Sequence, residues 1–178
     1  MNQLPNNQID VWKIEIPKHY SEENNLLSLL SENEKMRASK FATSALASRY
    51  IISQGILRRI LANYLSINPE AISYTFGTYK KPYLEDKTSN IQFNLSHSGD
   101  MALVAISSED EVGVDIEIIN EKALEKNLAP SILSPNEFTA FQRMQKMQQI
   151  EAFFSAWTHK EALLKLMGVG LYKEMKEL

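Results

Sequence analysis

The sequence of 178 residues contains no cysteine, which excludes disulfide bonds and thiolate metal sites. It has no apolar run long enough to span a bilayer, and the polar residues 1–10 lack the apolar core of a secretion signal. No basic run is present and the formal net charge is −3, so nothing supports nucleic-acid binding. These absences predict a cytoplasmic protein that binds neither nucleic acid nor membrane.

The fractions of hydrophobic and charged residues, 44% and 23%, are those of an ordinary globular protein, and the length allows one domain or two small lobes. Apolar periodicity and capping residues predict an alternation of strands and helices. We expect strands over 9–16, 72–76, 92–96, 101–107 and 112–119, and helices over 21–30, 31–41, 44–65, 121–128, 134–147 and 148–167.

The segment 112–119 is the most informative, because its alternation places Gly113, Asp115 and Glu117 on one face of a strand. The two carboxylates would have Cα atoms about 7 Å apart, close enough to converge on one hard cation. An edge strand with a solvated acidic face is the alternative that the same pattern allows.

The helix over 148–167 carries Glu161 in the middle of its apolar stripe. A buried carboxylate needs a partner, which could be Lys165 one turn later or a cation shared with Asp115 and Glu117. In the helix over 44–65, Arg49 falls on the apolar stripe and Arg58 opposite it. An inward guanidinium requires an anion, either a protein carboxylate or a ligand phosphate.

Three stretches together resemble the motifs of the 4′-phosphopantetheinyl transferases. They are Gly113-Val114-Asp115-Ile116-Glu117, the helix from Phe154 to Lys165 followed by Gly168-Val169-Gly170-Leu171, and Phe93-Asn94-Leu95-Ser96-His97-Ser98-Gly99. The acidic strand follows about a hundred residues of chain, as in the two-lobed, surfactin-synthetase-activating type. The resemblance implies an α+β fold of two pseudo-symmetric lobes, each a long helix on an antiparallel sheet, over 1–108 and 109–178. The second lobe would lack the C-terminal strands of the family.

The resemblance also implies the roles of the acidic residues. Asp115, Glu117 and Glu161 would bind Mg²⁺, with Mn²⁺ not distinguished from it. Asp115, Glu161 and Lys165 would be catalytic, and either Glu161 or a metal-bound water would accept a proton.

Coenzyme A would be held by basic and polar residues of both lobes. Lys81 before Pro82 matches the family better than Lys80, although one extra residue leaves that alignment open. The implied coenzyme A contacts are Arg37, Arg49, Lys81, Pro82, Ser96, His97, Lys160 and Lys165.

The implied activity is transfer of 4′-phosphopantetheine from coenzyme A to a serine of an apo acyl or peptidyl carrier protein, with release of adenosine 3′,5′-bisphosphate. Two other functions stay open on the sequence alone. One is a non-catalytic module that binds coenzyme A or a carrier protein, and the other is a Mg²⁺-dependent nucleotide phosphohydrolase.

Overall fold

A three-stranded antiparallel sheet organises the first hundred residues of the computed structural model, which describes residues 8–120, 128–169 and 175–178. Strand β5 (Met101–Ser107) lies in the centre, between β1 (Ile9–Glu15) and β4 (Gln92–Ser98). Strands β2 (Tyr74–Phe76) and β3 (Pro82–Leu84) form a separate antiparallel pair. The prediction had missed β3.

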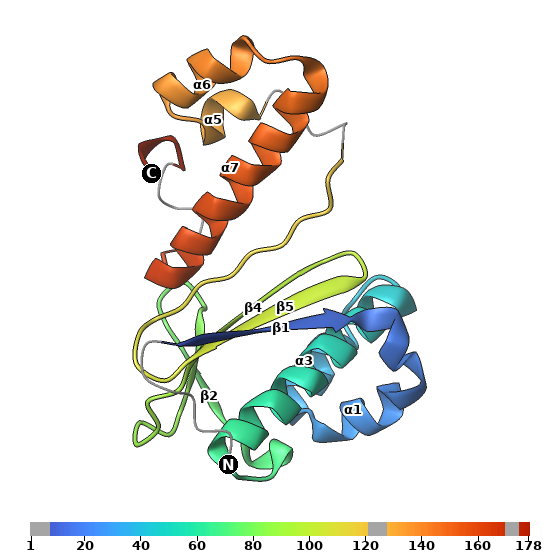
Figure 1. Ribbon diagram of the computed structural model, residues 1–178. Helices are drawn as coiled ribbons and strands as arrows, with labels where there is room; N and C mark the ends of the chain where they lie inside the picture. Colours follow the sequence, from blue (N-terminus) through green and yellow to red (C-terminus); the bar gives the residue numbers. More distant parts are fainter. Residues whose placement is uncertain (1–7, 121–127, 170–174) are drawn as a thin grey trace.

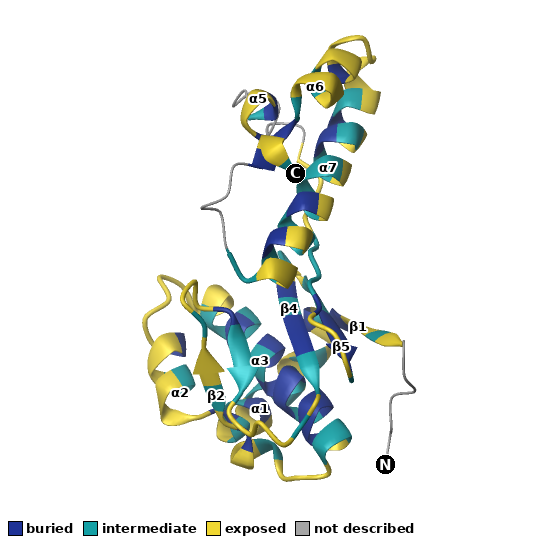
Figure 2. Cartoon of the chain, turned by 90° about the vertical axis from the view of Figure 1, so that its left-hand side faces the viewer, coloured by how far each residue is buried: buried dark blue, intermediate teal, exposed yellow. Residues whose placement is uncertain are grey.

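The long helix α3 (Ser44–Leu65) lies along one face of this sheet (Figure 1). It has the predicted bounds, and Thr43 caps its start by accepting a hydrogen bond from the backbone N–H of Leu46. Its other side is covered by η1 (Ile16–Glu22), α1 (Glu23–Leu29) and α2 (Glu32–Ala38), and η2 (Pro69–Ala71) follows it. The helix is therefore buried on both sides, as Figure 2 shows in dark blue.

The C-terminal part contains α5 (Ala129–Ile132), α6 (Pro135–Gln142), α7 (Lys146–Met167) and η4 (Met175–Glu177). These helices bury a second apolar cluster, which includes Ile132, Phe141, Phe153, Leu164 and Met175. Ser134 and Glu137 form a capping box at the start of α6. The predicted helix over 134–147 ends earlier, because Gln145 adopts an extended conformation and caps α7.

The fold is α+β, as predicted, with its two sheets in residues 9–107. In the C-terminal ranges that the structure describes, 128–169 and 175–178, there are only helices. The division into lobes at 108/109 stays a prediction, and the predicted helix over 121–128 lies outside the described residues. No helix in the described ranges has both the length and the apolar character needed to cross a membrane.

The predicted strand over 112–119 is wrong. Residues 111–120 run extended beside β4 but form no backbone ladder with it. Side chains of β4 hold the segment instead: Asn94 Oδ1 accepts from the N–H of Val114 at 3.0 Å, and Ser98 Oγ accepts from the N–H of Ile118 at 3.1 Å. These N–H groups are therefore bonded to side chains of β4, where strand pairing would need its backbone carbonyls.

Candidate functional site

A buried cluster of Ser96, Asp115 and Lys165 joins β4, the extended segment and α7. Lys165 Nζ donates to Asp115 Oδ1 at 2.5 Å and to Ser96 Oγ at 2.7 Å, while Ser96 Oγ donates to Asp115 Oδ1 at 2.8 Å. The Asp115 side chain is only 3% exposed. Two of these three bonds end on Asp115 Oδ1, and Oδ2 of Asp115 is buried without a partner among the described residues.

Gly113 explains how α7 comes so close to this segment. A Cβ at Gly113 would lie 2.0 Å from the carbonyl oxygen of Ala162 and 2.5 Å from the backbone N of Leu166. From the sequence, a glycine beside the two carboxylates would leave open space next to them. The structure places α7 itself in that room, with Glu161 and Lys165 directed to the same side as Asp115.

Glu161 and Glu117 complete the acidic surroundings of the cluster. The pKa of Glu161 is raised, first by desolvation and then by the negative charge of Asp115, with a smaller contribution from Glu117 and an opposing one from Lys165. Glu117 Oε2 accepts from Ser98 Oγ at 2.8 Å. The carboxylates of Asp115, Glu117 and Glu161 therefore lie near one another, and the ammonium of Lys165 partly compensates their negative charge.

A divalent cation fits this donor set in its chemistry. Carboxylate oxygens are the ligands that Mg²⁺ and Mn²⁺ prefer, the buried Oδ2 of Asp115 lacks a partner, and a cation would relieve the repulsion that raises the pKa of Glu161. Within the described residues, no three acidic or histidine side chains already stand close enough together to hold a metal ion. Loading a cation therefore requires side-chain movement.

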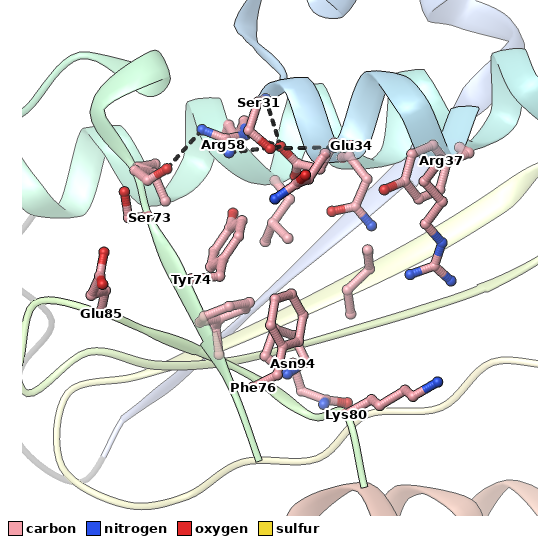
Figure 3. A pocket seen from close by; sticks show the side chains of 18 of the residues that line it. Ser31, Glu34, Arg37, Arg58, Ser73, Tyr74, Phe76, Lys80, Glu85 and Asn94 are labelled. Carbon is pink, nitrogen blue, oxygen red and sulfur yellow. Dashed lines mark hydrogen bonds and ion pairs between the residues drawn. The ribbon is translucent and has the colours of Figure 1, made fainter. Parts of the chain in front are cut away.

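A pocket of about 510 Å³ lies beside β4 and is lined in part by that strand (Figure 3). Aromatic side chains form much of its wall, including Tyr50, Tyr74 and Phe76. Arg37, whose guanidinium lies 5.3 Å from the centre of the Tyr50 ring, and Lys80 are among the cations of its lining. The cavity thus combines a surface for a planar apolar group with cations for a phosphate.

His97 connects the pocket with the carboxylate cluster. It lines the pocket, and its pKa is lowered first by partial desolvation and then by the Lys165 ammonium, with Glu117 acting in the opposite direction and Arg37 in the same one. By surface area the residue is nevertheless exposed, so its ring remains accessible to a ligand. Because His97 lines the pocket and directly follows Ser96 of the cluster on β4, the two sites adjoin.

Of the residues predicted to bind coenzyme A, Arg37, Pro82 and His97 line this pocket, while Ser96 and Lys165 belong to the cluster beside it. The other three predicted residues are cations paired with protein carboxylates. Arg49 bonds to Asp100 at 2.8 Å, Lys160 to Glu137 at 2.7 Å, and Lys81 to Glu111.

Arg58 and Lys80 are pocket residues that the sequence did not single out. The expectation that Arg58 points outward is wrong: its side chain is 1% exposed and bonds to Glu34 at 2.7 Å and to the carbonyl of Ile72 at 3.0 Å. A single apolar stripe was assumed, but α3 is covered on both sides, so either side could be the inner one. The extra lysine before Lys81 was the only signal for Lys80.

A carboxylate and lysine cluster that can take a cation, next to a basic and aromatic pocket, defines a protein that handles a phosphorylated ligand. Comparisons with known proteins are consistent with this class. Residues 17–109 match the family model described as "4′-phosphopantetheinyl transferase, N-terminal", and residues 111–178 match the "4′-phosphopantetheinyl transferase superfamily".

Curated relatives carry the same name. The transferase HetI of Nostoc sp. is 32% identical over 96% of this chain and 73% of its own length. The transferase gsp of Aneurinibacillus migulanus is 31% identical over 89% of the chain and 63% of its own length. AcpT of Escherichia coli K12 is 39% identical over 62% of the chain and 55% of its own length. The chain therefore belongs to the 4′-phosphopantetheinyl transferase superfamily, a family of transferases, and spans from about half to three quarters of these relatives.

Proposed function

We propose that this chain transfers 4′-phosphopantetheine from coenzyme A to a serine hydroxyl of an apo acyl or peptidyl carrier protein. Family membership supports the reaction class, and the unpartnered Oδ2 of Asp115 in its acidic cluster is the observation that carries the site. The serine Oγ forms a bond to the phosphorus next to the pantetheine. The bond from that phosphorus to the bridging oxygen breaks, and adenosine 3′,5′-bisphosphate leaves.

Asp115, Glu117 and Glu161 are the residues that would hold Mg²⁺ or Mn²⁺, which when bound neutralises charge on the diphosphate. Glu161, on which the charge of Asp115 acts, would accept the serine proton. Lys165 donates to the diphosphate oxygen on which charge develops. Its ammonium already lies between Ser96 and Asp115, so it needs only a short movement.

The nucleotide end of coenzyme A occupies the pocket. Arg37 and His97 face its phosphates, and the aromatic wall takes the base. For Arg49 and Lys160, a role in phosphate binding stays a prediction, because each would have to exchange a protein carboxylate for the ligand. A cytoplasmic location likewise stays a prediction from composition.

Mass spectrometry of the acceptor tests the proposal. The protein is incubated with coenzyme A, Mg²⁺ and an apo carrier protein, and the carrier should gain the mass of one phosphopantetheine group. A second arm omits the carrier. Cleavage of coenzyme A in that arm would indicate a phosphohydrolase, and binding of coenzyme A without turnover in either arm would indicate a non-catalytic module.

A further inference from the structure

The side chains of the adjacent residues Lys80 and Lys81 have different environments: that of Lys80 lines the pocket, and that of Lys81 is buried. The two residues end the tight turn between β2 and β3, which is closed by bonds from the N–H of Lys80 to the carbonyl of Gly77 and from the N–H of Gly77 to the carbonyl of Lys81. Lys80 has φ +65°, a left-handed conformation that is strained for a residue with a side chain. The exposed Lys80 side chain extends into the pocket, where Figure 3 shows it on the side of Arg37.

Lys81 is buried, with 6% of its side chain exposed, and its ammonium is saturated. Nζ donates to Glu111, to the carbonyl of Leu166 at 3.0 Å and to the carbonyl of Val112 at 3.3 Å. An ammonium has three N–H groups, so three acceptors leave none for a ligand. Moving Lys81 to a phosphate would leave Glu111 without its cation and would unpair two carbonyls, which opposes the movement.

Two of the groups that accept hydrogen bonds from Lys81 lie next to the residues that position the carboxylate cluster. Val112 directly precedes Gly113, where the extended segment touches α7. Leu166 belongs to the last turn of α7, whose carbonyls lack partners within the helix and attract a positive charge. Lys81 therefore fixes the start of the segment that carries Asp115 against the end of the helix that carries Lys165.

We infer that the two lysines have different roles. Lys80 contacts the anionic part of the ligand, and Lys81 is a positioning residue that holds α7 against the segment with Asp115. The Lys80 part rests on the proposed function. The Lys81 part rests only on contacts within the chain.

Calorimetry with coenzyme A tests Lys80. We expect Lys80→Met to weaken binding about tenfold, since a charge-assisted bond to phosphate contributes about 1.5–3 kcal/mol and this one is exposed to solvent. Lys81→Met should stay within about twofold of the parent, as should Lys87→Met, which replaces an exposed lysine outside the pocket. Tenfold weaker binding by Lys81→Met together with parent-like binding by Lys80→Met would overturn the assignment.

Steady-state kinetics test Lys81. Lys81→Met should lower kcat at least about tenfold with a much smaller change in the KM for coenzyme A, because α7 shifts while the pocket does not. Glu111→Gln should act in the same direction, and the two changes combined should cost less than the product of their separate effects. A raised KM with an unchanged kcat in Lys81→Met would identify Lys81 as a ligand contact and refute the inference.

A ligand-free measurement separates this inference from the proposed function. Amide hydrogen exchange of residues 163–168 should be faster in Lys81→Met than in the parent and in Lys80→Met. Unchanged exchange would refute the positioning role. A parent protein that does not bind coenzyme A would refute the proposed function and the Lys80 part with it, and the exchange result would still decide the role of Lys81.

Discussion

Asp115 is the residue on which most of the proposed chemistry depends. Its side chain is buried, one of its oxygens accepts hydrogen bonds from both Lys165 and Ser96, and the other has no partner among the described residues. We expect Asp115→Asn, which keeps the shape and removes the charge, to reduce turnover by about 10²-fold or more, the scale of losing one preorganised electrostatic contact. The carrier modification assay measures this loss.

The fold should survive this change, because Lys165 is 29% exposed and can turn to water. Circular dichroism of Asp115→Asn checks the fold, and Asp110→Asn, an exposed acid on the same connection, should transfer at the parent rate. Parent-like turnover by Asp115→Asn would remove Asp115 from the site.

Residue types and spacing predicted which side chains would carry the chemistry, but not which partners they have. The charges of Asp115 and Glu117 act on Glu161, so the three carboxylates lie near one another, and their joint role in the site stays a prediction. Arg49 illustrates what was missed, since the sequence required an anion and could not choose between a ligand phosphate and Asp100, 51 residues away. Such choices depend on tertiary distances that a local pattern does not contain.

At the scale of elements, the packing of α7 on the extended segment depends on Gly113. A methyl group there would press against backbone atoms of Ala162 and Leu166, which cannot turn away. We expect Gly113→Ala to lower the free energy of unfolding by about 1–3 kcal/mol, the usual cost of overpacking, and to impair turnover because Lys165 shifts with α7. Chemical denaturation and the carrier assay measure the two effects.

Gly77→Ala is the matched control for that prediction. Its added methyl group would lie 3.1 Å from Cε2 of Tyr83, which is the end of a movable side chain. Comparable losses in both variants would show that the backbone contact at Gly113 is not the cause.

The start of α6 should make stability dependent on pH. The pKa of Glu137 lies below its usual value, because Lys160 donates to it and the backbone N–H of Ser134 adds a second bond. A lowered pKa stabilises the fold above the unfolded value of 4.5, and the effect is lost as pH falls through the folded value. Because Glu137 is 43% exposed, we expect Glu137→Gln to cost about 1 kcal/mol or less, or up to about 2–4 °C in Tm, at pH 7.

Thermal melts across pH test this dependence. The difference in Tm between the parent and Glu137→Gln should shrink as the pH falls below 4.5 and close where Glu137 of the parent is also protonated. Glu151→Gln, at an exposed position on α7, should melt like the parent at every pH. A difference in Tm that is the same at pH 4 and pH 7 would show that the loss of stability comes from the geometry of the cap alone and not from the charge of Glu137.

Elements defined by local rules were predictable and those defined by distant neighbours were not. The bounds of α3 and the capping boxes of α2 and α6 follow from residues within a few positions of each terminus. Residues 112–119 have the alternation of a strand, yet Asn94 and Ser98 occupy their backbone N–H groups. Strand formation needs a second backbone at the right distance, and alternation alone cannot supply it.

At the scale of the whole molecule, the described residues bury two separate apolar clusters. One lies between α3 and the sheet, and the other lies among α5, α6 and α7. The connection between them is polar: it consists of Lys81 with its three acceptors, Lys165 with Ser96 and Asp115, and the contact at Gly113. The proposed ligand site lies at this connection, so a ligand would bind both halves at once.

This arrangement predicts how the protein unfolds. Without ligand, the polar connection should couple the clusters weakly, and differential scanning calorimetry should show two transitions, with the helical cluster expected to melt first because it is smaller. Coenzyme A with Mg²⁺ should stabilise the part that melts first the most, by about 2.7 kcal/mol in the free energy of unfolding at a hundredfold excess over Kd. The Tm of the lower transition should then approach the Tm of the upper one. Coenzyme A alone should stabilise chiefly the transition of the sheet and α3, since the pocket lies there. A single ligand-free transition whose calorimetric and van't Hoff enthalpies agree would show one cooperative unit and refute this account of the connection.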